Sequence, residues 1–213
     1  MCQTTRTPPT SHSSPWYARI MNKTHLDYLA SPEWADRLQS DLLPWLESTI
    51  ELGDDVLEIG PGPGLTTDLL RQRVAAVTAV EIDADLAADL KVRLAGTNVE
   101  VIWGDGTELQ FPDDRFSAAT CFAMLHHVPS VAAQDQLFAE LHRVLRSGGC
   151  FVATDSVDTD RIRQAHIDDT YVPLDPATLE SRLRAAGFAD ITLEESGEYR
   201  EQGDQIRVTA LKS

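Results

Sequence analysis

One stretch decides the fold of this chain: Val56-Leu57-Glu58-Ile59-Gly60-Pro61-Gly62-Pro63-Gly64-Leu65-Thr66-Thr67. Its opening run, residues 56–59, is mostly apolar and predicts a short buried parallel strand. Three glycines then alternate with two prolines, and a helical pattern follows over residues 65–73. The glycines let the backbone turn sharply and let a ligand approach it closely. Strand, glycine turn and helix in this order indicate a nucleotide site in an open α/β sheet.

The order of the glycines narrows the choice of ligand. Gly60-x-Gly62-x-Gly64 differs from the dinucleotide fingerprint G-x-G-x-x-G, because Leu65 stands where the last glycine is expected. A P-loop is excluded, because no Gly-Lys-Ser/Thr sequence follows the turn. The turn therefore predicts close backbone contact with a ligand, disfavours a dinucleotide and excludes a P-loop nucleotide site.

Four further segments follow at regular intervals. Glu81 ends a second apolar run about 20 residues after the first glycine, which is the spacing of a carboxylate that binds ribose hydroxyls. Gly104-Asp105-Gly106 follows a third predicted strand, Leu125-His126-His127-Val128 follows a fourth, and Leu145-Arg146-Ser147-Gly148-Gly149 precedes a fifth. Together with Glu58-x-Gly60-x-Gly62-x-Gly64, this series over residues 50–155 resembles the class I S-adenosylmethionine-dependent methyltransferases that act on small molecules.

The resemblance implies a Rossmann-like three-layer α/β sandwich. Its mostly parallel sheet would have seven strands in the order 3-2-1-4-5-7-6, with strand 7 antiparallel. The hydrophobic periodicity by itself supports five alternating β/α units and a final pair of strands. We expect the methyltransferase domain over residues 53–213, a helical lid segment over residues 16–52, and a flexible tail over residues 1–15, which are rich in Ser, Thr and Pro.

Local signals place several helix boundaries. Ser31-Pro32-Glu33 predicts a helix start, and Pro44 predicts a kink or break in the helix that follows. A later helix should begin near Ser130 and end at Gly148-Gly149, before a fifth strand over residues 150–154. Residues 156–175 show no clear core pattern.

The resemblance implies S-adenosyl-L-methionine as cofactor and S-adenosyl-L-homocysteine as product. Glu58 would support the turn and reach the methionine part, often through water, while Glu81 would bind the ribose hydroxyls and Asp105 the adenine amino group. Taken alone, Glu58 also suits a turn cap and Asp105 an ordinary Asp-Gly turn. The expected cofactor residues are Glu58, Gly60, Gly62, Gly64, Glu81, Ile82, Asp105, Gly106, Phe122 and Ala123.

Two adjacent histidines are the catalytic candidates. His126 and His127 follow the fourth strand, where a neutral imidazole is suited to take a proton from a nucleophile. A Leu-His-His segment also occurs in relatives with different substrates, and this favours a structural role as the alternative. For the substrate and lid region we expect Trp16, Tyr17, His25, Tyr28, His166 and Tyr171; the alternative for the last two is a solvated acidic loop.

Composition limits the partners. The net charge of −16 repels polyphosphate, and no basic block compensates for it, so we expect neither nucleic acid nor a membrane as partner. The segment Cys121-Phe122-Ala123-Met124 also lacks the Asn/Asp-Pro-Pro-aromatic sequence of DNA amine methyltransferases. Three cysteines in no framework spacing favour a reducing cytoplasm, and the absence of a Cys-x-x-Cys pair or Cys/His cluster predicts no metal. We expect a monomer or a homodimer.

These observations lead to one hypothesis and two alternatives. We expect methyl transfer from S-adenosylmethionine to an oxygen, nitrogen or carbon nucleophile of a small molecule by in-line displacement, with the nucleophile held close to the methyl group. One alternative is a non-catalytic sensor or partner subunit that binds S-adenosylmethionine. The other is an NAD-dependent oxidoreductase, which Leu65 disfavours.

Overall fold

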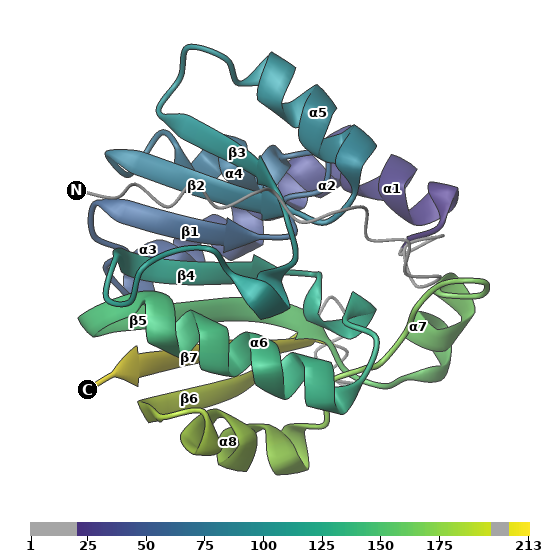
Figure 1. The fold of residues 1–213 in the computed structure, drawn as a ribbon. Coiled ribbons are helices and arrows are strands. Elements are labelled where there is room, and N and C mark those ends of the chain that lie inside the picture. Colours follow the sequence, from purple (N-terminus) through teal and green to yellow (C-terminus); the bar gives the residue numbers. More distant parts are fainter. Residues whose placement is uncertain (1–20, 197–204) are drawn as a thin grey trace, which may run out of the picture.

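The computed structural model describes residues 21–196 and 205–213 of the chain, and seven strands in it form one sheet. The strand order is β3-β2-β1-β4-β5-β7-β6 (Figure 1). β7 runs antiparallel to both of its neighbours, whereas the other pairs are parallel. This confirms the predicted topology. The strands are β1 Asp55–Ile59, β2 Ala76–Glu81, β3 Val99–Trp103, β4 Phe116–Phe122, β5 Leu145–Ser156, β6 Phe188–Ser196 and β7 Gln205–Lys212.

Helices precede and separate these strands. They are α1 Lys23–Leu29, α2 Pro32–Arg37, α3 Leu43–Thr49, α4 Leu65–Leu70, α5 Ala84–Arg93, α6 Val131–Val144, α7 Asp160–Ala165 and α8 Pro176–Ala185, with a π-helical turn η2 Leu38–Leu42 and 3₁₀ turns η3 Gly106–Glu108 and η4 Leu125–His127. The Ser31 side chain accepts the Trp34 N–H at the start of α2, as predicted. Pro44 lies in the first turn of α3, directly after the π-helical turn, so the helix is divided there by a change of helix type, while the backbone stays in the right-handed helical region.

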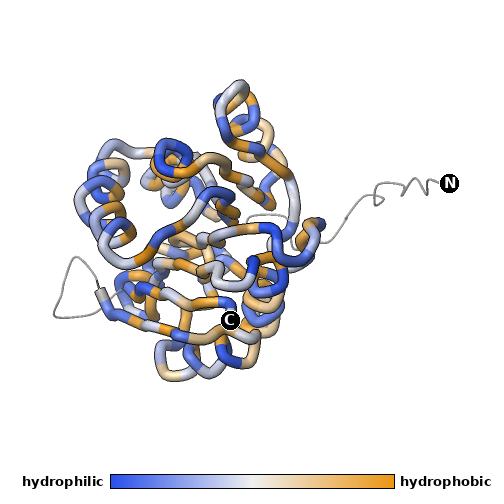
Figure 2. Tube along the Cα trace, turned by 90° about the vertical axis from the view of Figure 1, so that its left-hand side faces the viewer, coloured by the Kyte–Doolittle hydropathy of each residue, from blue (hydrophilic) through white to orange (hydrophobic). Residues whose placement is uncertain are grey.

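Helices cover both faces of the sheet. Along β1, Val56 packs in a cluster with α1 to α4, whereas Leu57 packs in the cluster formed with α6 and α8. Successive strand residues point to opposite faces, so one strand serves both cores. In Figure 1, α6 lies in front of the sheet and α4 behind it. Apolar and polar residues alternate along the elements in Figure 2, as buried and solvent-facing positions require.

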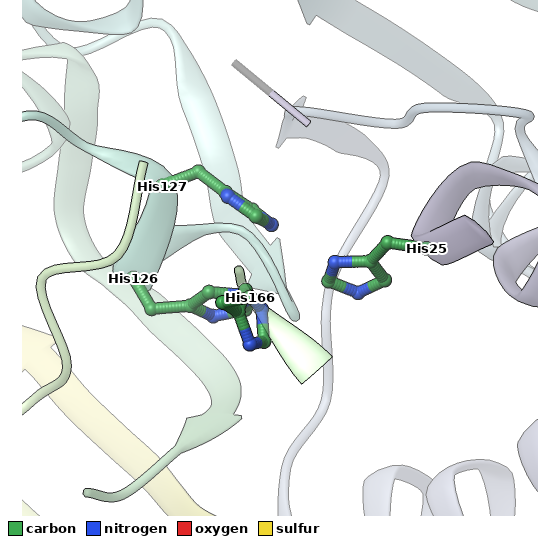
Figure 3. Close-up of side chains that lie close together, drawn as sticks. All are labelled: His25, His126, His127 and His166. Atoms are coloured by element: carbon green, nitrogen blue, oxygen red, sulfur yellow. The ribbon is translucent and has the colours of Figure 1, made fainter. Parts of the chain in front are cut away.

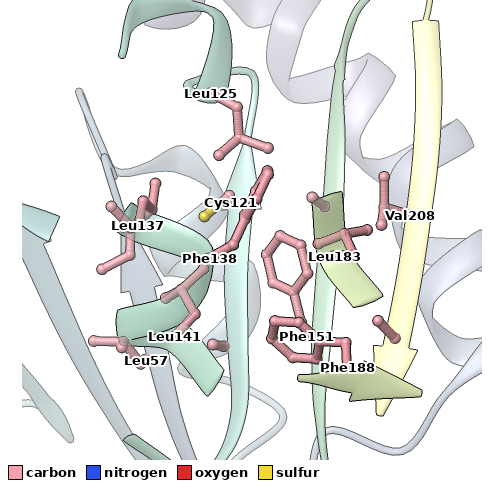
Figure 4. Packing of buried hydrophobic residues seen from close by; sticks show 14 of the residues in the cluster. Leu57, Cys121, Leu125, Leu137, Phe138, Leu141, Phe151, Leu183, Phe188 and Val208 are labelled. Atoms are coloured by element: carbon pink, nitrogen blue, oxygen red, sulfur yellow. The ribbon is translucent and has the colours of Figure 1, made fainter. Parts of the chain in front are cut away.

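The core on the α6 side is built from aromatic and aliphatic side chains. The Phe138 and Phe151 rings lie 6.0 Å apart, and the Phe151 and Phe188 rings lie 5.6 Å apart (Figure 4). Leu141 and Leu183 are completely buried beside them. Each side chain of this size stabilises the fold by about 1.5–3 kcal/mol through removal from water. This layer packs on β4, whose carboxyl end borders the site.

One expectation about local structure is wrong. α6 ends at Val144, and β5 begins at Leu145, so Gly148-Gly149 lies inside the longer strand β5 instead of ending the helix. The apolar Leu145, which is completely buried, pairs with Phe116 of β4 and so extends the strand. Residues 156–175 contain the short helix α7, which Thr159 caps. Its one buried residue, Ile162, is too little for a periodic signal.

Within the part of the chain that the structure describes, no helix is long and apolar enough to cross a membrane.

Candidate functional site

A cavity of about 490 Å³ opens at the carboxyl ends of β1 to β4. Its volume falls in the range of small-molecule sites, and its position is that of ligands in open α/β sheets. Most of the expected residues line it: Gly60, Gly62, Glu81, Ile82, Asp105, Gly106, Phe122, Ala123 and His127. Others do not: Glu58, Gly64, His25, Tyr28, His126, His166 and Tyr171. Trp16 and Tyr17 lie outside the described residues.

The glycines of the turn have two different roles. Gly62 has a φ of +52° and lines the cavity, and a Cβ placed on it would meet no described atom within 4 Å. Its backbone therefore borders open space that a ligand can fill. Gly64 has a φ of +83°, and a Cβ there would collide with Leu90 and Arg93 of α5. The third glycine thus serves the start of α4 and its packing on α5 instead of ligand contact.

Glu81 presents a carboxylate at the end of β2. Its Oε2 accepts the N–H of Gly62 at 2.9 Å, and its Oε1 accepts the N–H of Asp83 at 2.9 Å. The side chain is almost fully buried, and this burial raises its pKa. Each carboxylate oxygen has two acceptor sites, so one site on each remains for a hydroxyl of the ligand. This donor-poor, acceptor-rich end of the cavity fits the two ribose hydroxyls of S-adenosylmethionine.

Asp105 and Gly106 form the next strand end. The Oδ1 atom of Asp105 accepts both the N–H and the hydroxyl of Thr107, each at 2.8 Å, so the side chain caps η3 as a turn residue would. The same side chain lines the cavity, so the turn role and a ligand role are compatible. A Cβ on Gly106 would lie 2.9 Å from Ile59 Cγ2, so only glycine fits there.

Glu58 lies behind the turn instead of facing the cavity. It is 1% exposed, and its Oε1 accepts the hydroxyl of Thr66. Its Oε2 has no hydrogen-bond partner among the described residues. Burial raises the pKa of Glu58 to about 7. The structure thus shows the turn-supporting role, whereas direct contact with a ligand would require the turn to move.

The end of β4 is held in an unusual backbone conformation. Ala123 has a φ of +53°, a region that residues with a Cβ rarely adopt. Its N–H donates to the Thr154 carbonyl of β5 at 2.8 Å, which fixes the bend. Phe122 and Ala123 both line the cavity. Backbone strain of this kind is concentrated at functional sites.

The two candidate catalytic histidines have different surroundings. Both lie on η4, but only His127 lines the cavity. The Nδ1 atom of His127 lies 3.0 Å from the Thr170 carbonyl, and burial lowers its pKa to about 2. The Nδ1 atom of His126 lies 2.6 Å from Asp155 Oδ1, and His126 is 1% exposed. The predicted loop-fixing role is therefore present at His126.

His25 and His166 join this pair, and all four imidazoles lie together (Figure 3). The solvated acidic loop considered for this segment is found only in part: Asp168 is exposed, whereas His166 is 7% exposed and the Asp169 side chain is completely buried. Burial also lowers the pKa of His166, and it lowers that of His25 to about 4. This polar segment turns inward and meets η4. The sequence pattern of residues 156–175 did not indicate this contact.

The apolar roof of the cavity contains residues that sequence reasoning missed. Leu26, Leu29 and Trp34 line it from α1 and α2, Met21 lines it from just before α1, and Thr170 lines it from the loop before α8. Tyr28, which was expected here, instead packs beside Trp34, with ring centroids 5.6 Å apart. Leu26 and Leu29 are three residues apart and share one helix face, a spacing that was available as a signal.

The comparisons with known proteins agree with this geometry. Residues 57–153 match the family described as "Methyltransferase domain". A ubiquinone biosynthesis O-methyltransferase of Azotobacter vinelandii is 31% identical over 110 residues, covering 49% of this chain and 46% of that protein. A ribosomal RNA small subunit methyltransferase A of Deinococcus radiodurans is 48% identical over 59 residues, covering 28% of this chain and 20% of that protein. The match with these curated relatives therefore spans between a fifth and about half of their length.

A solved structure extends the likeness to the whole fold. A SAM-dependent methyltransferase from Aquifex aeolicus superposes with a TM-score of 0.70 at 19% identity, covering 91% of this chain and 100% of that one. Residues 57–153 thus match a methyltransferase family, and the sheet order and the solved structure show that the described chain has the same fold. The open space at Gly62 and the free acceptor sites on Glu81 fit S-adenosylmethionine.

Proposed function

We propose that this protein transfers the methyl group of S-adenosylmethionine to a small-molecule acceptor. The acceptor's nucleophilic atom forms a bond to the methyl carbon while the carbon–sulfur bond breaks and its electron pair stays on sulfur, giving S-adenosylhomocysteine. The nucleophile then loses its proton if it carried one. The observation that supports this proposal most is the cavity, in which Gly62 and Glu81 form a nucleoside-binding end beneath an apolar roof.

The protein contributes position and exclusion of water. An in-line transfer gains up to roughly 7–11 kcal/mol when the nucleophile is held at reacting distance. Met21, Leu26, Leu29 and Trp34 form an apolar wall over the cavity, and such a wall keeps water from competing as nucleophile. We therefore propose residues 16–52 as a lid segment for the domain that follows. The residues proposed to bind the cofactor are Gly60, Gly62, Glu81, Ile82, Asp105, Gly106, Phe122 and Ala123.

Two features favour a small acceptor over RNA. The net charge of −16 opposes binding to a polyanion, and the acceptor end of the cavity is apolar. The relative from Azotobacter vinelandii is named for ubiquinone biosynthesis, which suits a partly apolar acceptor. The relative from Deinococcus radiodurans is named for ribosomal RNA and aligns over only 59 residues. A partly apolar phenol, amine or carboxylic acid is therefore the acceptor that we propose.

A transfer assay tests this function. Purified protein is incubated with S-adenosylmethionine labelled in its methyl group and with separate panels of phenols, amines, carboxylic acids, ribosomal RNA fragments and unfolded protein. We expect label to move only to members of the small-molecule panels, and we expect Glu81→Ala to slow this transfer at low cofactor concentration. Transfer only to RNA or protein contradicts the proposed acceptor class. Tight binding of S-adenosylhomocysteine without any transfer supports the non-catalytic alternative.

A further inference from the structure

Four histidine side chains meet in one buried place beside the cavity. His126 and His127 come from η4, His25 from α1, and His166 from the end of α7 (Figure 3). One ring nitrogen from each lies within 4.8 Å of the corresponding nitrogens of the other three. The one other histidine among the described residues, His142, packs on Phe188 instead, and the centroids of these two rings lie 5.2 Å apart.

The orientation of three of these rings is set from behind. The Nδ1 atom of His126 faces the Asp155 carboxylate at 2.6 Å, that of His127 faces the Thr170 carbonyl at 3.0 Å, and that of His166 faces the Ile162 carbonyl at 2.7 Å. A carbonyl oxygen only accepts, so Nδ1 carries the hydrogen in His127 and His166, and the carboxylate favours the same arrangement in His126. The three Nε2 atoms are then unprotonated and carry a lone pair each.

Nothing in the described part of the chain satisfies these lone pairs. The Nε2 atoms of His126, His127 and His166 are all buried without a hydrogen-bond partner. The three side chains are 1%, 6% and 7% exposed. A buried polar atom without a hydrogen-bond partner costs about 1–3 kcal/mol of stability. The three Nε2 atoms are all acceptors, so they cannot form hydrogen bonds with one another. A positive ion between them removes this cost at all three atoms.

The arrangement matches the way proteins prepare histidine as a metal ligand. A ligating histidine typically donates its other ring N–H to a carboxylate or backbone carbonyl, which fixes both tautomer and orientation. His126, His127 and His166 each show that support. Imidazole nitrogens suit zinc and its transition-metal neighbours, whereas calcium and magnesium prefer oxygen ligands. At about 2.0–2.1 Å from zinc, four nitrogens lie about 3.4 Å apart, so small inward rotations of the rings close the site.

We propose that His25, His126, His127 and His166 bind one divalent transition-metal ion, with zinc as the representative. Three ligands are preset by the body of the fold and by α7, and His25 completes the set from α1. The Nδ1 atom of His25 lies 3.7 Å from Asp169 Oδ2, so a slight movement gives this ring the same kind of support. The ion thus joins α1, part of the cavity roof, to η4 and α7. It lies at the cavity wall, because His127 lines the cavity.

This site changes the expectation for His127. An Nε2 atom that binds a metal ion is not available as a general base. An acceptor in the cavity then meets a metal-bound imidazole at this wall instead of a free imidazole. The site shares only His127 with the cavity lining, and the metal is measured without cofactor or acceptor, so metal binding does not depend on the proposed methyl transfer.

The test uses tag-free full-length protein. Metal content is measured by plasma mass spectrometry after purification without chelators, and zinc is then titrated by calorimetry into protein stripped with phenanthroline. We expect one zinc per chain and a higher melting temperature with zinc. His166→Asn and His126→Asn should each weaken zinc binding by at least about 10-fold, whereas His142→Asn, the matched control outside the cluster, should leave it unchanged.

A second measurement needs no variant and so does not depend on the variants folding. X-ray absorption at the zinc edge of the wild-type protein should show four nitrogen ligands at about 2.0 Å with imidazole scattering. Six oxygen ligands, or zinc that binds equally well to the wild-type and the His126→Asn/His166→Asn protein, would place the ion elsewhere. No zinc binding to the stripped wild-type protein means that water fills the cluster, and this overturns the proposal.

Discussion

Glu58 is a carboxylic acid that the fold keeps almost completely from water. Burial raises its pKa from 4.5 to about 7. The folded chain therefore holds a proton between pH 4.5 and about 7 that the unfolded chain has released. The stability gained from protonated Glu58 is complete below about pH 4.5 and is lost as the pH rises through about 7. The amount lost is about 3 kcal/mol.

Replacing Glu58 with Gln should remove this dependence, because the amide does not titrate. We expect the free energy of unfolding of the wild type, relative to Glu58→Gln, to fall by about 3 kcal/mol between pH 4.5 and 8. Urea unfolding at a series of pH values measures this difference. Glu33→Gln, at an exposed position of α2, controls for the loss of one carboxylate. A difference that is constant across this range would show that Glu58 ionises in the fold as it does in water.

At the scale of single residues, sequence predicted some positions and missed others for a physical reason. Glu81 and Asp105 were predicted because each follows a strand, and strand ends meet at one edge of a parallel sheet. The resemblance implied that Glu58 supports the turn and also reaches the ligand, often through water, but its side chain bonds to Thr66 behind the turn. Residue spacing does not encode which way a side chain points at a sharp turn.

The lid elements show how ligand binding should change the molecule. α1 is a seven-residue helix whose Leu26 and Leu29 face the cavity. A helix of this length is marginal by itself, so its stability depends on what it packs against. A ligand in the cavity adds contacts beneath it and should therefore hold it closed.

Amide hydrogen exchange measures this effect. With S-adenosylhomocysteine at about 100 times its dissociation constant, we expect exchange in α1 to slow by up to about 100-fold, because opening must release the ligand. α8 packs on the other face of the sheet, away from the cavity, and is the internal control. Equal slowing in both helices would show only global stabilisation, and unchanged exchange in α1 would mean that it is not a lid.

Elements with strong periodicity were predicted well, and those without it were not. β3 and the start of α6 at Ser130 lie where the pattern put them. α7 was missed because it buries a single side chain, Ile162. The histidine cluster was missed for a related reason: its ligands come from α1, η4 and α7, and only the three-dimensional fold brings these together. Metal motifs are recognisable in a sequence when the ligands share one local segment.

At the scale of the whole molecule, the sheet determines where chemistry can occur. β1 and β4 are neighbours at the point where the strand order reverses, and the cavity opens at their carboxyl ends. The resemblance predicted the sheet topology, and the topology predicted the position of the site. The acceptor does not follow from either, because many acceptors fit one fold. The apolar roof and the negative charge of the chain are the features that narrow its class.

The central claim is that this cavity binds S-adenosylmethionine through Glu81, and calorimetric titration with S-adenosylhomocysteine tests it most directly. We expect micromolar binding to the wild type, no binding of NAD, and affinity about 5- to 150-fold lower in Glu81→Ala, equivalent to about 1–3 kcal/mol. Glu180→Ala, on α8 and outside the cavity, is the matched control. Tight binding of NAD, or affinity for S-adenosylhomocysteine that Glu81→Ala leaves unchanged, would contradict the account.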